Sequence, residues 1–475
     1  MTNTQSKLND VLSPKKILII VPDGIGVRNY LYSTHFEKLA KNAEVSIWSG
    51  VPTEVLLKNL KISQNNTVSI ADLSLFSQPI LSRFFWETAS WARLKFFSRE
   101  VKNKSLLFNR ANAKWSRVWR LFLFCTRFLG TLISWNYRLI SLCDKLSKRF
   151  WGEKTIRFYQ KLLQHGEFDS ILITHQRVAQ LMPICIAANR LGVKVTSVIF
   201  SWDNIPKAKL AIQADYFLVW SEHMKEELQL YYREIKAENI FITGTPQFEF
   251  YFQQERILPR NEFAQRFGLD INRTWICYSG DDTTTSPYDE RYLEDVLEAI
   301  ATIEEDIRPH VIFRRAPVDF SDRYDRVREK FKSLVTFIDP ILLSDSTIWN
   351  GFLTSPEDVN LLVNMVRHCE LVINIGSTMA HDFAVYDKPC IYINYNVANR
   401  INWSINTIYK FEHFRSMDGM NPVIFLNDNS KWAETIKYVM SNPDKVAIDR
   451  KKWLRKIVLH PLEKSSDRII DQLLK

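Results

Sequence analysis

Apolar runs that alternate with helix-like stretches constrain this chain more than any other feature. Residues 372–393, VINIGSTMAHDFAVYDKPCIYI, pass from an apolar run through a small polar turn and a helix-like stretch to a second apolar run. This succession predicts a strand, a helix and a second, parallel strand. The same alternation opens at residues 15–21 and recurs through residues 170–243 and 274–338. We therefore expect an α/β protein built on parallel sheets.

The length of the chain indicates two such domains. It has 475 residues, of which 46% are hydrophobic and 24% charged, as in ordinary globular proteins. We predict an N-terminal Rossmann-like domain over residues 1–255 and a C-terminal one over 256–475, which ends in a helix. Two parallel-sheet domains in one chain imply a cleft between them, where small ligands commonly bind.

Cysteine usage and the polar start indicate the compartment. The six cysteines are scattered and form no CxxC pair, which favours a reducing compartment without a disulfide framework or a zinc site. The first residues, MTNTQSKLNDVLSPKK, lack the apolar core of a secretion signal. We expect a cytoplasmic protein.

The positive charge is concentrated in one segment. Residues 83–160 contain 17 Lys and Arg against four Asp and Glu, whereas the rest of the chain has 46 basic and 49 acidic residues. Six of the 14 tryptophans also lie here: Trp86, Trp91, Trp115, Trp119, Trp135 and Trp151. The segment interrupts the α/β rhythm, and we predict a basic aromatic helical insertion over residues 80–165.

The most apolar part of this insertion, residues 121–143, is too interrupted to span a bilayer. Arg127 and Arg138 leave only ten uncharged residues between them, whereas a spanning helix needs about 20 apolar ones. We expect one or two amphipathic helices on an anionic membrane surface, which would place the protein on the inner face of the cell membrane. The alternative is a helical insertion packed on the protein itself. Nucleic acid could use the same residues, but no nucleic-acid motif accompanies them, and we expect no such partner.

Polar clusters follow several predicted strands, at the edge where parallel sheets bind ligands. Hydroxyl, guanidinium and backbone N–H groups bind phosphate, and a carboxylate can accept hydrogen bonds from a ribose. We predict the following donor-nucleotide-binding residues: Thr283, Thr284, Arg314, Arg315, Gly376, Ser377, Thr378 and Asp382. The alternative is that residues 376–378 only form a turn and cap a helix, and that Arg315 makes a surface salt bridge.

A general base must reach the hydroxyl of an acceptor. Asp23, His175 and Asp203 follow predicted strands of the first domain, and we rank Asp23 first because loops after the first strand face the cleft. Residues 202–204 could instead be structural. Gly24 and Gly26 form part of a dinucleotide fingerprint, but Asn29 replaces its third glycine, so we expect no nicotinamide or flavin cofactor.

Four stretches resemble the GT-B glycosyltransferases, and within them the bacterial CDP-glycerol glycerophosphotransferase-like and surface-polysaccharide glycosyltransferase group. They are SWDNIPKAKLAIQADYFLVWSEHMKEEL, ITGTPQFEFY, VIFRRAPVD and EDVNLLVNMVRHCELVINIGSTMAHDFAVYDKPCIYI, and the resemblance covers about residues 170–395. It implies two facing Rossmann-like domains, with the donor nucleotide on the second, the acceptor on the first, and no metal. Arg315-Ala316-Pro317 stands where that group has R-x-H-P, so a histidine is missing.

The resemblance implies a transferase that moves a sugar from a nucleotide-sugar to a glycan acceptor, which we expect to be lipid-linked, in bacterial surface polysaccharide synthesis. Three alternatives stay open. One is a CDP-glycerol-type polyol-phosphate transferase. Another is a sugar-nucleotide epimerase of the same fold, which would have no use for the basic insertion. The third is a non-catalytic GT-B scaffold at the membrane, which the missing histidine favours. In each enzymatic case the nucleotide-activated donor is a substrate, and no other cofactor is expected.

Overall fold

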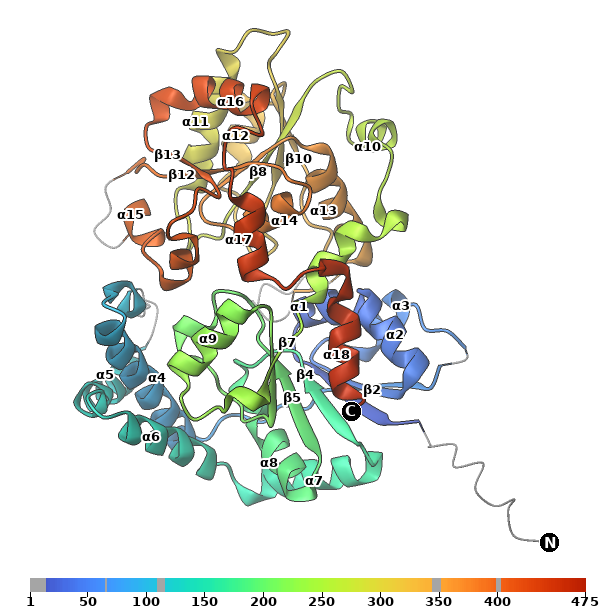
Figure 1. Cartoon of the computed structure of the whole chain (residues 1–475), viewed down its shortest axis with the longest axis vertical. Helices are drawn as coiled ribbons and strands as arrows, with labels where there is room; N and C mark the ends of the chain where they lie inside the picture. Colours follow the sequence, from blue (N-terminus) through green and yellow to red (C-terminus); the bar gives the residue numbers. More distant parts are fainter. Residues whose placement is uncertain (1–13, 65, 109–115, 344–351, 399–402) are drawn as a thin grey trace, which may run out of the picture.

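The computed structural model describes residues 14–475 apart from residue 65 and residues 109–115, 344–351 and 399–402. Trp115 and most of the polar start therefore lie outside the described residues. The described chain forms two lobes, one above the other in Figure 1, and each is built around a parallel sheet. The prediction of an α/β protein with two parallel-sheet domains is confirmed.

The sheet of the first lobe has seven strands in the order β3-β2-β1-β4-β5-β6-β7. The order reverses between β1 and β4, where Ile19 lies beside Leu172, and such a switch point opens a crevice at the carboxyl ends of the strands. The strands are β1 (Lys16–Val21), β2 (Glu44–Ser49), β3 (Val68–Asp72), β4 (Ser170–Ile173), β5 (Lys194–Val198), β6 (Tyr216–Val219) and β7 (Ile240–Ile242).

The sheet of the second lobe has six strands in the order β10-β9-β8-β11-β12-β13. Its switch point lies between β8 and β11, where Cys277 pairs with Val372. The strands are β8 (Trp275–Ser279), β9 (His310–Arg314), β10 (Val335–Phe337), β11 (Val372–Asn374), β12 (Cys390–Ile393) and β13 (Ile424–Leu426). The sequence analysis did not predict β3 and β13.

Helices pack on both faces of each sheet, which explains why the central strands are continuous apolar runs. In β1, Ile17, Ile19 and Val21 belong to one buried cluster, and Leu18 and Ile20 to another. The helices of the first half of the chain are α1 (Gly24–Gly26), α2 (Thr34–Asn42), α3 (Thr53–Asn59), α4 (Ile80–Glu100), α5 (Arg117–Ile133), α6 (Tyr137–Arg149), α7 (Glu153–Gly166), α8 (Met182–Leu191) and α9 (Glu222–Tyr231).

The helices of the second half lie around the second sheet, except the last one. They are α10 (Arg260–Phe267), α11 (Asp289–Ala301), α12 (Asp325–Lys330), α13 (Pro356–His368), α14 (Met379–Val385), α15 (Ile405–Ile408), α16 (Trp432–Ser441), α17 (Arg450–Ile457) and α18 (Ser465–Leu473). Short helical turns complete the chain, among them the π-helix η1 (Val27–Leu31) and the 3₁₀ helices η2 (Lys104–Leu107), η6 (Pro246–Phe252) and η8 (Glu412–Met417).

The last helix, α18, returns to the first lobe and packs on α2 (Figure 1). Lys38 of α2 pairs with Asp467 at 2.5 Å. The buried Glu249 of η6 accepts hydrogen bonds from Thr34 of α2 at 2.6 Å and from the backbone and hydroxyl of Ser466 at 2.5 and 2.7 Å. The chain therefore passes between the lobes twice. The division at residues 255 and 256 stays a prediction, but α18 clearly lies against the first sheet's lobe.

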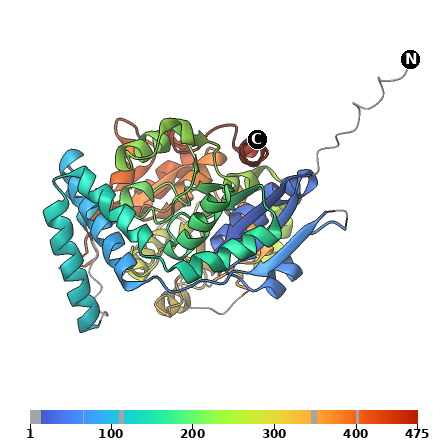
Figure 2. The same ribbon diagram turned by 90° about the horizontal axis from the view of Figure 1, so that it is seen from below.

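The predicted insertion forms α4, α5, α6 and α7. Helices α4, α5 and α6 lie at one side of the molecule (Figure 2), whereas α7 packs on α8 and belongs to the core of the first lobe. The apolar stretch 121–143 is not one continuous helix, because it breaks at residues 134–136, where the Asn136 side chain caps α6. In the part of the chain that the structure describes, every helix is too short or too polar to cross a bilayer.

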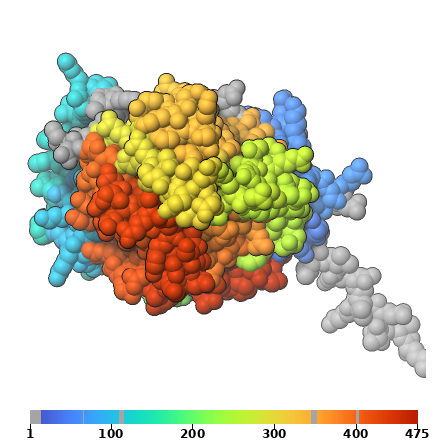
Figure 3. Space-filling view, turned by 90° about the horizontal axis from the view of Figure 1, so that it is seen from above, coloured from blue at the N-terminus to red at the C-terminus, as the bar shows by residue number. Residues whose placement is uncertain are grey.

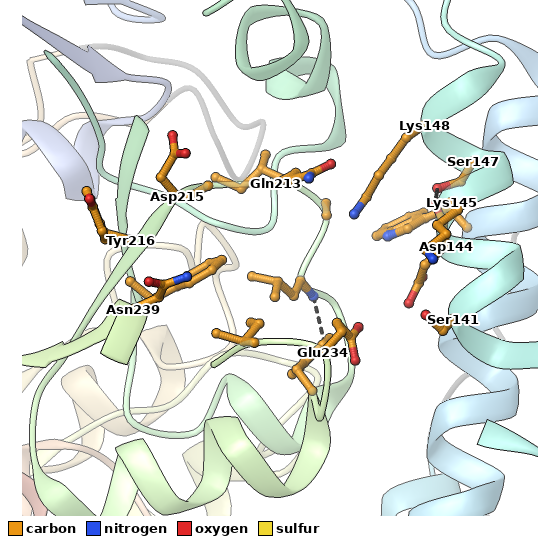
Figure 4. A pocket seen from close by; sticks show the side chains of 18 of the residues that line it. Ser141, Asp144, Lys145, Ser147, Lys148, Gln213, Asp215, Tyr216, Glu234 and Asn239 are labelled. Atoms are coloured by element: carbon orange, nitrogen blue, oxygen red, sulfur yellow. Dashed lines mark hydrogen bonds between the residues drawn. The ribbon is translucent and has the colours of Figure 1, made fainter. Parts of the chain in front are cut away.

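A buried ion network joins this insertion to the end of α9 and the loop that follows it in the first lobe. Arg93 of α4 is only 1% exposed and pairs with Asp144 of α6 and, at 3.1 Å, with Glu234, while its guanidinium also donates to the carbonyl oxygen of Tyr231 at 2.8 Å. Figure 4 shows Asp144 on the insertion facing the loop that carries Glu234. The insertion is thus packed on the protein on its inner side.

Candidate functional site

A cavity of about 320 Å³ lies between the two lobes, at the carboxyl ends of both sheets. Its walls come from both halves of the chain. The first half contributes Ile25, Arg28, Asn29, Phe200, Ser201, Trp220, Gln247, Phe250 and Tyr251; the second contributes Ser279, Gly280, Asp281, Asp282, Arg314, Arg315, Ala316, Pro317, Val318, Asp358, Val359, Leu362, Ser377, Thr378, Met379 and Asp382. The cleft that two parallel-sheet domains imply is therefore present.

The 376–378 turn joins β11 to α14 at the edge of this cavity. Gly376 has φ +68°, and a Cβ atom there would lie 2.7 Å from the ring of Phe414, so both conformation and space require glycine. The Asn374 side chain holds the turn by accepting from the Ser377 backbone N–H at 2.9 Å. Ser377 and Thr378 both line the cavity, whereas Gly376 does not line it and only allows the turn to form.

Asp382 lies one helical turn further into α14 and is buried. Burial raises the pKa of its carboxyl to about 6, although a hydrogen bond from Tyr251 and the positive charge of Arg28 both oppose that shift. Tyr251 and Arg28 belong to the first lobe, and both line the cavity. The Asp382 carboxyl is thus a hydrogen-bond acceptor placed where groups of both lobes meet.

The two arginines after β9 differ in their surroundings. Arg314 is buried and its guanidinium donates two hydrogen bonds to Asp358, at 2.7 and 2.8 Å, so its charge is already neutralised within the second lobe. Arg315 pairs with the half-exposed Asp339 at 3.1 Å and lines the same cavity. Ala316 and Pro317 line it too, so the position where the R-x-H-P pattern would have a histidine is at the site.

Thr283 and Thr284 are exposed and do not line the cavity. Their loop is organised by Asp282, whose carboxylate accepts from the backbone N–H groups of Thr284 at 2.7 Å and Thr285 at 3.1 Å. The neighbouring Asp281 lines the cavity instead. Burial, reinforced by Asp289 and Asp282, raises the pKa of the Asp281 carboxyl well above its ordinary value.

Asp23 and His175 lie together behind the cavity wall. The Asp23 carboxylate accepts from the backbone N–H of Gly26 at 2.9 Å and lies 2.5 Å from Nδ1 of His175. The His175 ring stacks on Phe200, a residue that lines the cavity, with 4.0 Å between ring centroids. The structure therefore brings two of the three predicted base candidates together, one side chain away from the site.

The two glycines of the incomplete dinucleotide fingerprint have packing roles. A Cβ atom at Gly24 would lie 2.0 Å from the backbone oxygen of Phe352 in the second lobe. At Gly26 it would lie 2.6 Å from the hydroxyl of Thr174. Both positions therefore require glycine because neighbouring atoms lie too close for a side chain, and at Gly24 the neighbour belongs to the other lobe.

Asp203 is held by Lys207 and by the Asn204 side chain, which donates to it at 2.8 Å. Burial works to raise the pKa of Asp203, but Lys207 and His413 outweigh it and hold that pKa below its usual range. Its neighbour Trp202 crosses to the second lobe, where its ring lies 4.9 Å from that of His381 and its N–H donates to the Thr378 hydroxyl at 3.3 Å. Asp203 itself does not line the cavity, which favours the structural reading of residues 202–204.

Arg28, Gln247 and Tyr251 also line the cavity but were not among the predicted site residues. Arg28 follows the first strand and Tyr251 lies in the quoted GTPQFEFY turn, so both were near predicted features. In the described residues no three His, Cys, Asp or Glu side chains gather as a metal site requires.

No protein-family model matches this chain, and no curated protein matches it. Solved structures do. A glycosyltransferase from Rickettsia africae is similar over 97% of this chain and 99% of its own, at 11% identity and a TM-score of 0.50. A putative UDP-N-acetylglucosamine 2-epimerase from Listeria monocytogenes covers 96% of this chain and 95% of its own, at 10% identity and a TM-score of 0.54.

A UDP-GlcNAc 2-epimerase from Methanocaldococcus jannaschii covers 96% of this chain and 99% of its own, at 12% identity and a TM-score of 0.51. At such identities the likeness concerns the fold, and it extends over almost the whole chain. Together with the two parallel sheets and the cavity between them, it shows that this chain has the GT-B fold, two facing Rossmann-like domains.

Proposed function

We propose that this chain is a glycosyltransferase that transfers a sugar from a nucleotide-sugar to a glycan acceptor in bacterial surface polysaccharide synthesis. The observation that carries the proposal is the cavity between the lobes, which brings together Ser377, Thr378, Arg315, Asp382 and, from the opposite lobe, Arg28. Hydroxyls and guanidinium groups suit a diphosphate, and a buried carboxylate suits a sugar hydroxyl. The similar solved structures include one described as a glycosyltransferase.

In this proposal the donor lies mostly against the second lobe. Arg315 and Arg28 approach the cavity from opposite sides, so a nucleotide diphosphate between them would neutralise both charges. These groups would also stabilise the negative charge that develops on the departing diphosphate, which is a role that a preorganised cation can perform without a metal ion. We accordingly propose neither a metal nor another cofactor.

The acceptor would enter from the first lobe, past Asn29, Gln247 and Phe250. We propose a lipid-linked glycan as the acceptor, which places the enzyme on the inner face of the cell membrane. The base stays a prediction among Asp23, His175 and Asp203, none of which lines the cavity. The Asp23–His175 pair contacts the cavity wall, because the His175 ring stacks on Phe200.

One alternative has a specific observation in its favour. Two of the similar solved structures are described as UDP-N-acetylglucosamine 2-epimerases, one of them as putative. An epimerase would bind the same donor in the same cavity and release it with an inverted carbon, without any acceptor. A polyol-phosphate transferase would instead prefer CDP-glycerol. A non-catalytic scaffold would bind neither.

The experiment that separates these functions is a thermal-shift screen followed by a product assay. Purified protein is heated with UDP, CDP, GDP, CMP and their sugar or glycerol conjugates, because a ligand that binds only the folded state raises the melting temperature. We expect a UDP-sugar or another nucleotide-sugar to stabilise the protein more than CDP-glycerol does. The stabilising donor is then incubated without an acceptor, and we expect its sugar to keep its configuration.

The results that contradict this proposal are distinct. An epimerised sugar without acceptor would make the protein an epimerase, and selective stabilisation by CDP-glycerol would make it a phosphotransferase. No shift with any nucleotide would favour the scaffold. As a check on the site, Arg315→Ala combined with Ser377→Ala should abolish the thermal shift. Arg326→Ala should keep it, because that side chain is 72% exposed on α12 and does not line the cavity.

A further inference from the structure

The outer face of α5 is apolar and exposed along its whole length. Its residues recur at spacings of three and four, as one helical face requires, and each is between 59% and 77% exposed: Val118, Leu121, Phe124, Phe128, Leu132 and, just beyond the helix, Trp135. A helix of 17 residues is about 25 Å long. A continuous apolar surface of this size that is exposed to water normally marks an interaction site.

The inner face of α5 packs on α4. Its fully buried residues are small or polar, namely Thr126, Gly130 and the C-cap Ser134, and the partly buried Phe122 and Ile133 pack on the α4 side. A Cβ atom at Gly130 would lie 2.8 Å from the backbone oxygen of Thr88, so α5 is held against α4 in one orientation. An amphipathic helix at a water-facing surface turns its apolar side inward. Here the large apolar side is outward and cannot rotate inward without a clash.

The surroundings of this face indicate what covers it. Residues 101–143 contain eight Lys and Arg and no Asp or Glu. The exposed Arg117 and Arg120 lie at one end of the face, and the exposed Arg138 just beyond the other. The guanidinium carbon of Arg83 lies 4.3 Å from the ring centroid of Trp119, and that of Arg99 lies 4.0 Å from the ring centroid of Trp135. Tryptophan and basic side chains at both ends of an apolar stripe are typical of helices that lie in an anionic lipid interface.

A second copy of the chain is a poorer partner for the same reason. Self-association through this face would bring two acid-free basic segments together, and like charges across an interface oppose binding. The cyan segment that contains α5 projects at the side of the molecule, beyond the edge of the second lobe, in Figure 3.

We propose that the outer face of α5, from Val118 to Trp135, inserts its apolar side chains into an anionic lipid bilayer. This inference names the surface and its orientation, and it does not depend on which reaction the cavity catalyses. The loop after α4 also contacts the second lobe, because Asn103 donates to Glu412 at 2.6 Å and to the carbonyl oxygen of Lys410 at 3.0 Å. A bilayer on α5 would therefore hold both lobes, and the cavity between them, at a fixed height above the lipid.

Cys125 allows a direct test. It lies on the outer side of α5 and is exposed, whereas the other five cysteines are buried, so a thiol-reactive, polarity-sensitive fluorophore should label it selectively. The labelled full chain is mixed with vesicles of phosphatidylcholine alone or with phosphatidylglycerol. We expect a blue-shifted, brighter emission only with the anionic vesicles, and a loss of that change at high salt.

Unlabelled variants test the residues themselves by sedimentation with the same vesicles. Phe124→Ser combined with Phe128→Ser should weaken binding by roughly tenfold or more, because two apolar side chains no longer enter the bilayer. Both side chains are exposed, so the fold should be unaffected, and the thermal shift with the donor should be retained. Ile448→Ser is the matched control, since Ile448 is 63% exposed on the second lobe.

Three results would overturn the proposal. The first is equal binding of the Phe pair variant and the wild type to anionic vesicles. The second is a label that responds identically to phosphatidylcholine alone, which would remove the role of lipid charge. The third is a concentration-dependent dimer in sedimentation equilibrium that the Phe pair variant abolishes, with no vesicle binding, which would assign the face to self-association.

Discussion

Asp382 illustrates a side chain whose environment opposes its charge. Its carboxyl is buried at the cavity between the lobes, and its pKa rises to about 6 from an ordinary value near 3.8. Between these two values the folded protein binds a proton that the unfolded chain has already lost. Stability therefore falls as pH rises through this window, and the full loss is present above pH 6. Titratable groups with a strongly shifted pKa are often functional.

The replacement Asp382→Asn removes this penalty without changing the shape of the side chain. We expect the variant to be more stable than the wild type at pH 8, by up to about 3 kcal/mol, and to equal it near pH 3.5. Urea unfolding across this pH range measures the difference. The same change should weaken donor binding, because an amide accepts hydrogen bonds less strongly than a carboxylate.

Asp444→Asn is the control, since the Asp444 side chain is 93% exposed. A stability gain for Asp382→Asn that does not depend on pH would contradict the assigned pKa.

Part of the cavity could be predicted from the sequence at this scale. Ser377, Thr378, Arg315 and Asp382 follow apolar runs, and parallel strands deliver such residues to one edge. Thr283 and Thr284 follow a strand as well, but Asp282 folds their loop so that they face solvent. Tyr251 was missed because it reaches the site from a 3₁₀ helix after β7, which has no periodic signature.

Among the elements, α4 is the one that joins the insertion to the rest of the first lobe. Its Arg93 is enclosed by Asp144, Glu234 and the ring of Tyr232, whose centroid lies 4.4 Å from the guanidinium carbon. Removing the cation would leave two carboxylates facing each other in a largely buried space. Loss of one partner from such a network is strongly destabilising.

We therefore expect Arg93→Met to lower the free energy of unfolding by about 3–5 kcal/mol. Lys95→Met on the same helix should cost less than about 1 kcal/mol, because Lys95 is only partly buried and has no carboxylate partner in the described residues. Denaturant titration gives both values. If the two variants unfold alike, the network does not hold the insertion.

The strands of the central sheets could be predicted because each is an apolar run that is buried on both faces. β3 and β13 are edge strands whose side chains stay partly exposed, so neither is a continuous apolar run that stands out in the sequence. The packing of the insertion could not be predicted. The sequence around Arg93 does not distinguish a buried arginine from the many exposed ones near it.

Across the whole molecule, Trp202 is the side chain that most directly joins the two lobes. It belongs to the first lobe, is 4% exposed, and packs with ring centroids 4.7 Å from His413 and 5.8 Å from Trp453 of the second. Its N–H also donates to Thr378, which lines the cavity. Trp202 therefore contributes both to the contact between the lobes and to the shape of the proposed donor site.

The variant Trp202→Ala should lose about 3–5 kcal/mol of stability, because a large buried ring is removed. We also expect calorimetry to resolve two transitions where the wild type shows one, since each lobe has its own sheet. Trp202→Phe should keep one transition but bind the donor more weakly, because it fills the space without donating to Thr378. A single transition for the alanine variant would show that other contacts suffice to couple the lobes.

The return of α18 to the first lobe sets an order for biosynthesis. A ribosome releases the chain from its N-terminus, and β7 emerges more than 200 residues before α18. At usual elongation rates this interval is on the order of tens of seconds. Throughout it, Glu249 lacks Ser466 and the face of α2 that α18 covers is open to water. The half of the protein that is made first is thus completed last, and a nascent-chain chaperone has that whole interval in which to bind the uncovered face of α2.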